Sequence, residues 1–177
     1  MNEQELLFFS HAANGPHENY YKEVSGHLEL HKIIDILEWV LLSFSKNEKS
    51  KLSRIHFHYL LYHVIALSSS GDKIWSNTES SLLAGSKIAS KQACDYDYHG
   101  EESVDFHEKV FYKMKTEEFE VEKGKHLKLN CSNPIIKFER NSIYYYITPV
   151  LVCRKPLKTV GLGDAISSTS LFYSIFN

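Results

Sequence analysis

The stretch TVGLGDAISS, residues 159–168, places two glycines and an aspartate directly before an apolar run. Glycines at this spacing indicate a backbone turn that passes close to another group. The run over residues 165–176 predicts a short helix, and a helix start presents unpaired N–H groups and the positive end of the helix dipole. The stretch therefore predicts an anion-binding turn. Asp164, an anion inside that turn, needs its own explanation, and a plain helix N-cap is one that its residue type allows.

The composition is that of one ordinary globular domain. The chain has 177 residues, of which 43% are hydrophobic and 24% charged, enough for a single core. The net charge of −2 and the scattered basic residues argue against nucleic acid as a partner. The ten histidines form no HExxH motif or zinc-type Cys/His spacing. No run approaches the roughly 20 apolar residues of a membrane span.

Hydrophobic periodicity predicts alternating helices and strands, and therefore an α/β domain. The expected elements are a helix over residues 2–12, a helix over 28–45, a strand beginning at 54, a helix over 78–94, two strands within 134–153 and the final helix. In the first strand, Ile55 and Phe57 should face one side of the sheet, and His56 and His58 the other. Arg140, Asn141 and Ser142 supply turn chemistry between the last two strands. The polar segment 95–125 predicts mainly loop.

Several stretches together resemble one known family. They are NEQELLF at residues 2–8, RIHFHYLLYHVIA, GSKIASKQAC, TPVLVC and the segment that runs through TVGLGDAISSTSLFYS. In this order they resemble the ADP-dependent glucokinases of the ribokinase-like superfamily, most weakly across residues 11–50 and 95–133. The resemblance implies a three-layer α/β fold, in which residues 1–177 are the C-terminal portion of the large nucleotide-binding domain. The N-terminal half, the sugar-binding residues and the lid would lie before residue 1.

The resemblance also assigns a role to each residue of the turn. Asp164 matches the catalytic base, which accepts the proton of the sugar hydroxyl. The backbone N–H groups of Gly161, Leu162 and Gly163 match an anion hole for the transferred phosphoryl group. The implied reaction converts ADP and glucose to AMP and glucose 6-phosphate with Mg²⁺ as cofactor. In that arrangement the N–H groups face the phosphate, while the carboxylate faces the acceptor alcohol.

Residues near the start of the chain match the N-x-x-E motif of the superfamily. Glu5 corresponds to the glutamate that acts on Mg²⁺, and the expected metal site therefore combines Glu5, Asp164 and, through water, Asn2. A helix cap is the alternative role for Asn2. Glu3 is interpreted as an exposed helix charge.

Two histidines are candidates for contact with the nucleotide. His56 and His58 lie on the strand that should end near the nucleotide, although core or edge positions are the commoner outcome for histidines.

The three cysteines are far apart, and their odd number leaves at least one thiol free or paired outside the chain. Cys94 and Cys153 match cysteines of the animal-type glucokinases, whereas Cys131 does not. The resemblance therefore predicts that Cys94 and Cys153 lie together beside the nucleotide site and form a disulfide in an oxidising compartment. Two separate buried thiols are the alternative. Because the animal-type enzymes are associated with the endoplasmic reticulum, that organelle or the secretory pathway is the expected location.

Two other functions remain open at this stage. A truncated, inactive chain would bind nucleotide without glucose, and the related ADP-dependent phosphofructokinases share the same turn. The expected partners are ADP or AMP and glucose, and we expect a monomer.

Overall fold

The computed structural model describes residues 1–23, 28–45, 52–68, 75–94, 109–112, 118–130 and 133–177. The helices are α1 (Glu3–Ala12), α2 (Tyr20–Glu23), α3 (Leu30–Ser45), α4 (Thr78–Ala93) and α6 (Leu162–Tyr173). The strands are β1 (Arg54–His58), β2 (Tyr62–Ser68), β3 (Trp75–Ser76), β4 (Val110–Tyr112), β5 (Glu118–Glu122), β6 (Lys125–Lys128), β7 (Ile136–Arg140), β8 (Ile143–Pro149), β9 (Leu151–Cys153) and β10 (Ile175–Phe176). Within these ranges no helix is both long and apolar enough to cross a membrane.

The largest sheet has four strands in the order β1-β2-β8-β7, and each neighbouring pair is antiparallel. The predicted mixture of helices and strands is confirmed. The expected strand from residue 54 is, however, the first arm of a hairpin, because the chain turns after His58 and returns as β2. The second hairpin turns at Asn141 and Ser142, two of the three residues predicted for the turn, while Arg140 is the last residue of β7. Asn141 and Ser142 have positive φ, 51° and 62°, which suits a tight two-residue turn between twisted strands.

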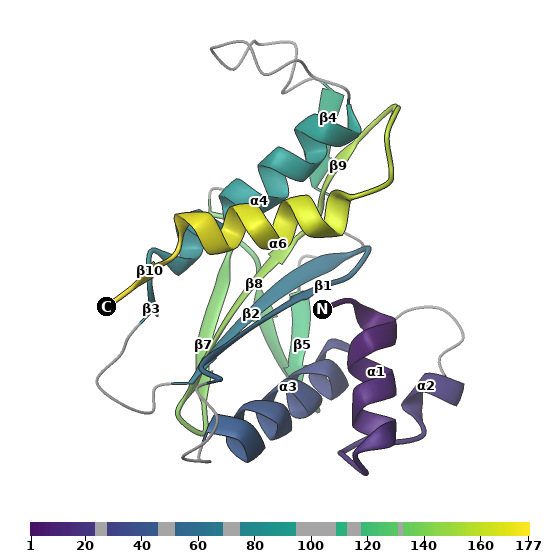
Figure 1. Ribbon diagram of the computed structural model, residues 1–177, viewed down its shortest axis with the longest axis vertical. Helices are drawn as coiled ribbons and strands as arrows, with labels where there is room; N and C mark the ends of the chain where they lie inside the picture. The colour runs from purple at the N-terminus through teal and green to yellow at the C-terminus, as the bar shows by residue number, and fades with distance from the viewer. Residues whose placement is uncertain (24–27, 46–51, 69–74, 95–108, 113–117, 131–132) are drawn as a thin grey trace.

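Helices cover both faces of this sheet (Figure 1). On one face, Ile55 and Phe57 pack into the main core with buried residues of α1 and α3. On the other face, Ile65 and Leu67 pack against Leu82 of α4. The predicted alternation along β1 is therefore confirmed, because Ile55 and Phe57 join the main core. The same alternation directs His56 and His58 toward the layer that contains α4 and α6.

Helices α4 and α6 lie side by side above that face of the sheet (Figure 1). A Cβ atom on Gly85 would lie 2.7 Å from the carbonyl oxygen of Ile166, so the two backbones approach as closely as a glycine allows. Helix α6 starts at Leu162, earlier than the expected residue 165. It ends at Tyr173 because the next residues pair with β3 as β10.

We predict that Gly85→Ala destabilises the protein by about 1–3 kcal/mol, because the new methyl group must push α6 away from α4. The measurement is the free energy of unfolding in urea. Alanine favours helix more than glycine does, so the expected loss arises despite a gain in helix propensity. The control is Ser80→Ala at an exposed position of the same helix, expected to change stability by less than about 0.5 kcal/mol. Equal stability of the Gly85→Ala variant and the wild type would disprove the close contact.

Candidate functional site

The turn at the start of α6 has the geometry of an anion site. Gly161 occupies the N-cap position with φ of 78°, in the left-handed region that favours glycine, and no side chain of the described residues caps this helix end. The first N–H groups of a helix have no partner within the helix, and the dipole makes this end positive. Asp164 is the third residue of the helix and is exposed. The alternative role of Asp164 as the N-cap is therefore wrong, because Gly161 holds that position.

His58 packs directly against this turn. A Cβ atom on Gly163 would lie only 2.7 Å from Cε1 of the His58 ring, so the absence of a side chain at Gly163 allows the contact. Burial lowers the pKa of His58, while the charges of Glu5, Glu3 and Asp164 act in the opposite direction. Carboxylates from the starts of α1 and α6 therefore act on the side chain at the end of β1. The structure brings together His58 and Asp164, both predicted from the sequence.

The start of α1 is fixed by a capping box. The Asn2 side chain accepts a hydrogen bond from the Glu5 N–H at 2.9 Å, and Glu5 Oε2 accepts one from the Asn2 N–H at 2.8 Å. The structure therefore gives Asn2 the helix-cap role that the sequence left open.

The metal assignment of Glu5 and Asp164 remains a prediction. No group of three or more His, Cys, Asp or Glu side chains within the described ranges could hold a metal ion. Mg²⁺ is usually held by one or two carboxylates together with waters and substrate phosphates. Glu5 and Asp164 are both exposed and carry oxygen donors of the kind that Mg²⁺ prefers.

A pocket of about 370 Å³ adjoins the turn. Its walls come from the β1–β2 hairpin, α4, β9 and the start of α6, and they are largely apolar, with residues such as Ala89, Val152 and Ile166. Glu3 and His58 provide polar groups beside them. The expectation that Glu3 is an exposed charge is wrong: Glu3 is half-buried, because α1 begins next to this pocket.

Three histidines on the same face of the sheet have different surroundings. His58 lines the pocket, whereas His56, two residues earlier on β1, is buried and does not line it. His63 on β2 pairs with His58 across the hairpin and also lines the pocket. Sequence reasoning missed His63 because it did not place the turn of the hairpin. Once that turn is known, the alternation of β2 puts His63 beside His58.

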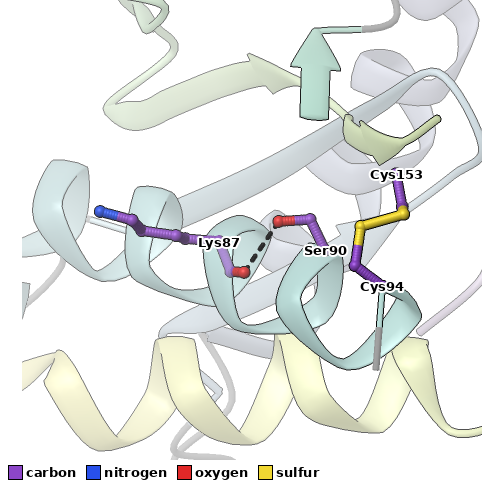
Figure 2. Close-up of a disulfide and its surroundings, with 4 residues drawn as sticks. All are labelled: Lys87, Ser90, Cys94 and Cys153. Atoms are coloured by element: carbon purple, nitrogen blue, oxygen red, sulfur yellow. Dashed lines mark hydrogen bonds between the residues drawn. A yellow bond between two sulfur atoms is a disulfide. The ribbon is translucent and has the colours of Figure 1, made fainter. Parts of the chain in front are cut away.

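A disulfide lies beside the pocket. Cys94 follows the last residue of α4, Cys153 ends β9, and their sulfur atoms are bonded with a Cα–Cα distance of 5.6 Å. Figure 2 shows this bond between the two elements, one turn of α4 beyond Ser90, whose hydroxyl donates to the Lys87 carbonyl at 2.8 Å. The bond connects the end of α4 to the segment that leads from β9 into the glycine turn. Cys153 also lines the pocket. Cys131 lies outside the described residues.

Residues 1–173 match the family described as the ADP-specific Phosphofructokinase/Glucokinase conserved region. The chain belongs to this family. The resemblance seen in the sequence is confirmed by two curated relatives. These are a "Probable ADP-dependent glucokinase" of Caenorhabditis elegans, 39% identical over 187 residues, and an ADP-dependent glucokinase of Bos taurus, 40% identical over 176 residues. The alignments cover 99% and 98% of the chain but 36% and 34% of the relatives, so the chain spans about a third of their length.

Solved structures of ADP-dependent kinases share the fold of this family member. The last common ancestor of ADP-dependent phosphofructokinases from Methanosarcinales has a TM-score of 0.64 and 23% identity, over 97% of the chain and 35% of that protein. A phosphofructokinase from Pyrococcus horikoshii OT3 with AMP has a TM-score of 0.59 and 14% identity, over 97% and 35% of the two chains. At these identities the likeness shows the fold alone.

We predict that loss of the disulfide destabilises this family member by about 4 kcal/mol on the chain-entropy model, because the bond joins residues 59 apart in the sequence. The double variant Cys94→Ser/Cys153→Ser should show this loss in urea unfolding, and a reductant should produce a similar loss in the wild type. The control is the double variant with the reductant, which has no such bond to lose and should not change further. A wild type that keeps its stability when fully reduced would contradict the prediction.

Proposed function

We propose that this chain supplies the catalytic turn and the nucleotide pocket of an ADP-dependent glucokinase, which transfers a phosphoryl group from ADP to glucose and releases AMP and glucose 6-phosphate. One observation carries the proposal. Asp164 lies in the first turn of α6, exposed and close enough to act on His58, while Gly161 takes the cap position. The helix therefore does not need the Asp164 side chain as its cap, and a proton acceptor stands beside an anion site.

The backbone N–H groups of the turn and the Asp164 side chain have different roles in the proposed reaction. The N–H groups of Leu162 and Gly163 lie at the positive end of α6, where a phosphate is stabilised by hydrogen bonds and by the helix dipole. Phosphoryl transfer depends mainly on such positioning and on neutralisation of charge. The Asp164 carboxylate accepts the proton of the attacking sugar hydroxyl as the new P–O bond forms and the bond to AMP breaks.

The pocket takes the nucleoside of ADP. A volume of about 370 Å³ lies within the range of small-molecule sites, roughly 300–1,000 Å³. Its apolar walls suit a flat heterocycle, and its polar end is next to the turn, through His58 and Gly163. The phosphates can then reach the start of α6 while the base stays between α4 and the hairpin.

Glucose is the favoured acceptor. The relatives at 39% and 40% identity are named as glucokinases, whereas the phosphofructokinase structures share 14% to 23% identity with the chain. The helices on both faces of the sheet support the finer assignment to the C-terminal portion of a three-layer, ribokinase-like nucleotide-binding domain. The other parts of that domain would come from a longer kinase.

Mg²⁺ would be held by Glu5 and Asp164, with Asn2 acting through water. When bound, it would neutralise charge on the transferring phosphate. The capping box orients Glu5 for this role, since one of its oxygens is already fixed by the Asn2 N–H. The disulfide supports a location in the endoplasmic reticulum or the secretory pathway, where such bonds persist.

Calorimetric titration of the 177-residue protein with ADP, AMP and glucose tests the binding part of this proposal. Binding of ADP and AMP is expected. Binding of nucleotide without glucose would assign the sugar site to other parts of a longer kinase, or the chain to the inactive, nucleotide-binding alternative. Absence of nucleotide binding would overturn the proposed function of the pocket.

We predict that Asp164→Asn in the complete kinase lowers turnover by about 10²–10⁴-fold, because the amide cannot accept the sugar proton. The affinity for ADP should stay nearly unchanged, because the backbone N–H groups remain. Formation of glucose 6-phosphate measures turnover, and calorimetry measures ADP affinity. The control is Glu139→Gln, which makes the same change from acid to amide at an exposed position on β7. Near-normal turnover of Asp164→Asn would remove the general-base role.

We predict that Glu5→Gln raises the Mg²⁺ concentration needed for half-maximal activity, because one negative charge near the metal is lost. Glutamine can still accept the hydrogen bond of the capping box, so the melting temperature should change little. The glucose concentration needed for half-maximal activity serves as the internal control and should not change. An unaltered Mg²⁺ requirement would leave Glu5 with the capping role only.

A further inference from the structure

The sequence contains one acceptor triplet for an N-linked sugar. Asn130, Cys131 and Ser132 form N-x-S, with a middle residue other than proline. No other asparagine of the chain has serine or threonine two positions later. Because such triplets also arise by chance, this one carries weight only if its asparagine lies at the surface and the protein folds in an oxidising compartment. The structure bears on both conditions.

Asn130 meets the first condition. It is exposed, two residues after the end of β6, whereas Leu129 beside it is buried in the main core. The Asn133 N–H donates to the Asn130 carbonyl at 3.1 Å, the bond of a four-residue turn on the way to β7. A sugar on the Asn130 side chain can therefore extend into solvent without displacing a core residue.

The disulfide meets the second condition. Cys94 and Cys153 are 59 residues apart in the sequence, yet their sulfur atoms are bonded. Such bonds persist in secreted proteins and in the endoplasmic reticulum and are rare in the cytosol. N-linked sugars are likewise a feature of proteins that enter the secretory pathway. The disulfide and the triplet share no residue, so two separate features indicate the same compartment.

The Asn130 turn lies away from the proposed nucleotide pocket. Leu129 packs with the α1 and α3 side chains of the main core, whereas α4 and the start of α6 form walls of the pocket. Within the described ranges, no residue from 118 to 130 or from 133 to 149 lines that pocket. A bulky hydrophilic group at Asn130 therefore leaves the pocket and the glycine turn accessible.

We propose that Asn130 is an N-glycosylation site. The sugar donor is an oligosaccharide on a lipid diphosphate, and an oligosaccharyltransferase of the endoplasmic reticulum transfers it. Nδ2 of Asn130 forms a bond to the anomeric carbon of the sugar, while the bond from that carbon to the diphosphate oxygen breaks. The lipid diphosphate leaves, and one Nδ2 proton passes to a base of the transferase. This inference goes beyond the proposed function and shares with it only the location.

The experiment uses the protein produced in animal cells from its own gene, without an added targeting signal. Trypsin should release residues 129–137, LNCSNPIIK, as one peptide that contains both asparagines of the turn. Mass spectrometry should find the oligosaccharide on this peptide. A peptide N-glycosidase should then convert Asn130 to aspartate and leave Asn133 as the internal control. An unmodified Asn130 would overturn the inference, and this measurement needs no variant that could fail to fold.

Four variants locate the acceptor. Asn130→Gln and Ser132→Ala should each lower the glycosidase-sensitive mass of the protein by one oligosaccharide, whereas Ser132→Thr should keep it, because threonine also completes the triplet. The matched control is Asn133→Gln, which changes an exposed amide of the same turn that Pro134 follows, and it should keep the oligosaccharide. An unchanged glycosidase-sensitive mass in Asn130→Gln would contradict the assignment.

The redox state of Cys94 and Cys153 separates this inference from the location on which it depends. Alkylation before and after reduction should find the two cysteines bonded. Bonded cysteines with an unmodified Asn130 overturn the glycosylation and leave the location intact. Reduced cysteines with an unmodified Asn130 contradict both. A sugar on Asn130 with reduced cysteines supports the glycosylation and contradicts the disulfide.

Discussion

The close contact between α4 and α6 is the constraint on which the site depends. Gly85 lets the Ile166 backbone approach α4, and this approach sets how far the start of α6 lies from the sheet. At that distance Gly163 touches the His58 ring, which is held by the end of β1. Two contacts at glycines therefore position an anion-binding helix start against a strand end. A small increase in helix separation would be transmitted directly to the turn, because close-packed interiors do not absorb such changes locally.

Three further connections hold the turn from other directions. The disulfide joins the end of α4 to β9, and the Leu157 N–H donates to the Ala93 carbonyl at 2.8 Å. The Gln92 side chain donates to the Val160 carbonyl at 3.3 Å, immediately before the cap residue. The disulfide fixes the start of the loop that precedes α6, and the two hydrogen bonds link the end of α4 to the loop itself. The loop itself is exposed, so these links to a buried helix are what give it a defined position.

The face of the sheet below α4 and α6 carries both packed apolar side chains and buried histidines. Ile65 and Leu67 pack there as expected for a core, but His56 and His63 lie on the same face without partners among the described residues. Burial lowers the pKa of both rings, and neutrality makes their burial tolerable.

The sequence by itself determined four helices (α1, α3, α4 and, with its start and end misplaced, α6), the faces of β1, the turn at Asn141 and Ser142 and the family, because each follows from local periodicity or from residues in a fixed order. The short helix α2 was not predicted. It also identified Asp164 and the glycine turn, since backbone geometry at a helix start depends on adjacent residues. Only the tertiary structure decided that Gly161 is the cap, that Glu3 is half-buried and that His63 joins His58. It also confirmed the pairing of Cys94 with Cys153 that the resemblance predicts, against the alternative of two separate thiols. These facts depend on where the hairpin turns and on how closely two helices approach, and both are set by packing between residues far apart in the chain, which no local pattern records.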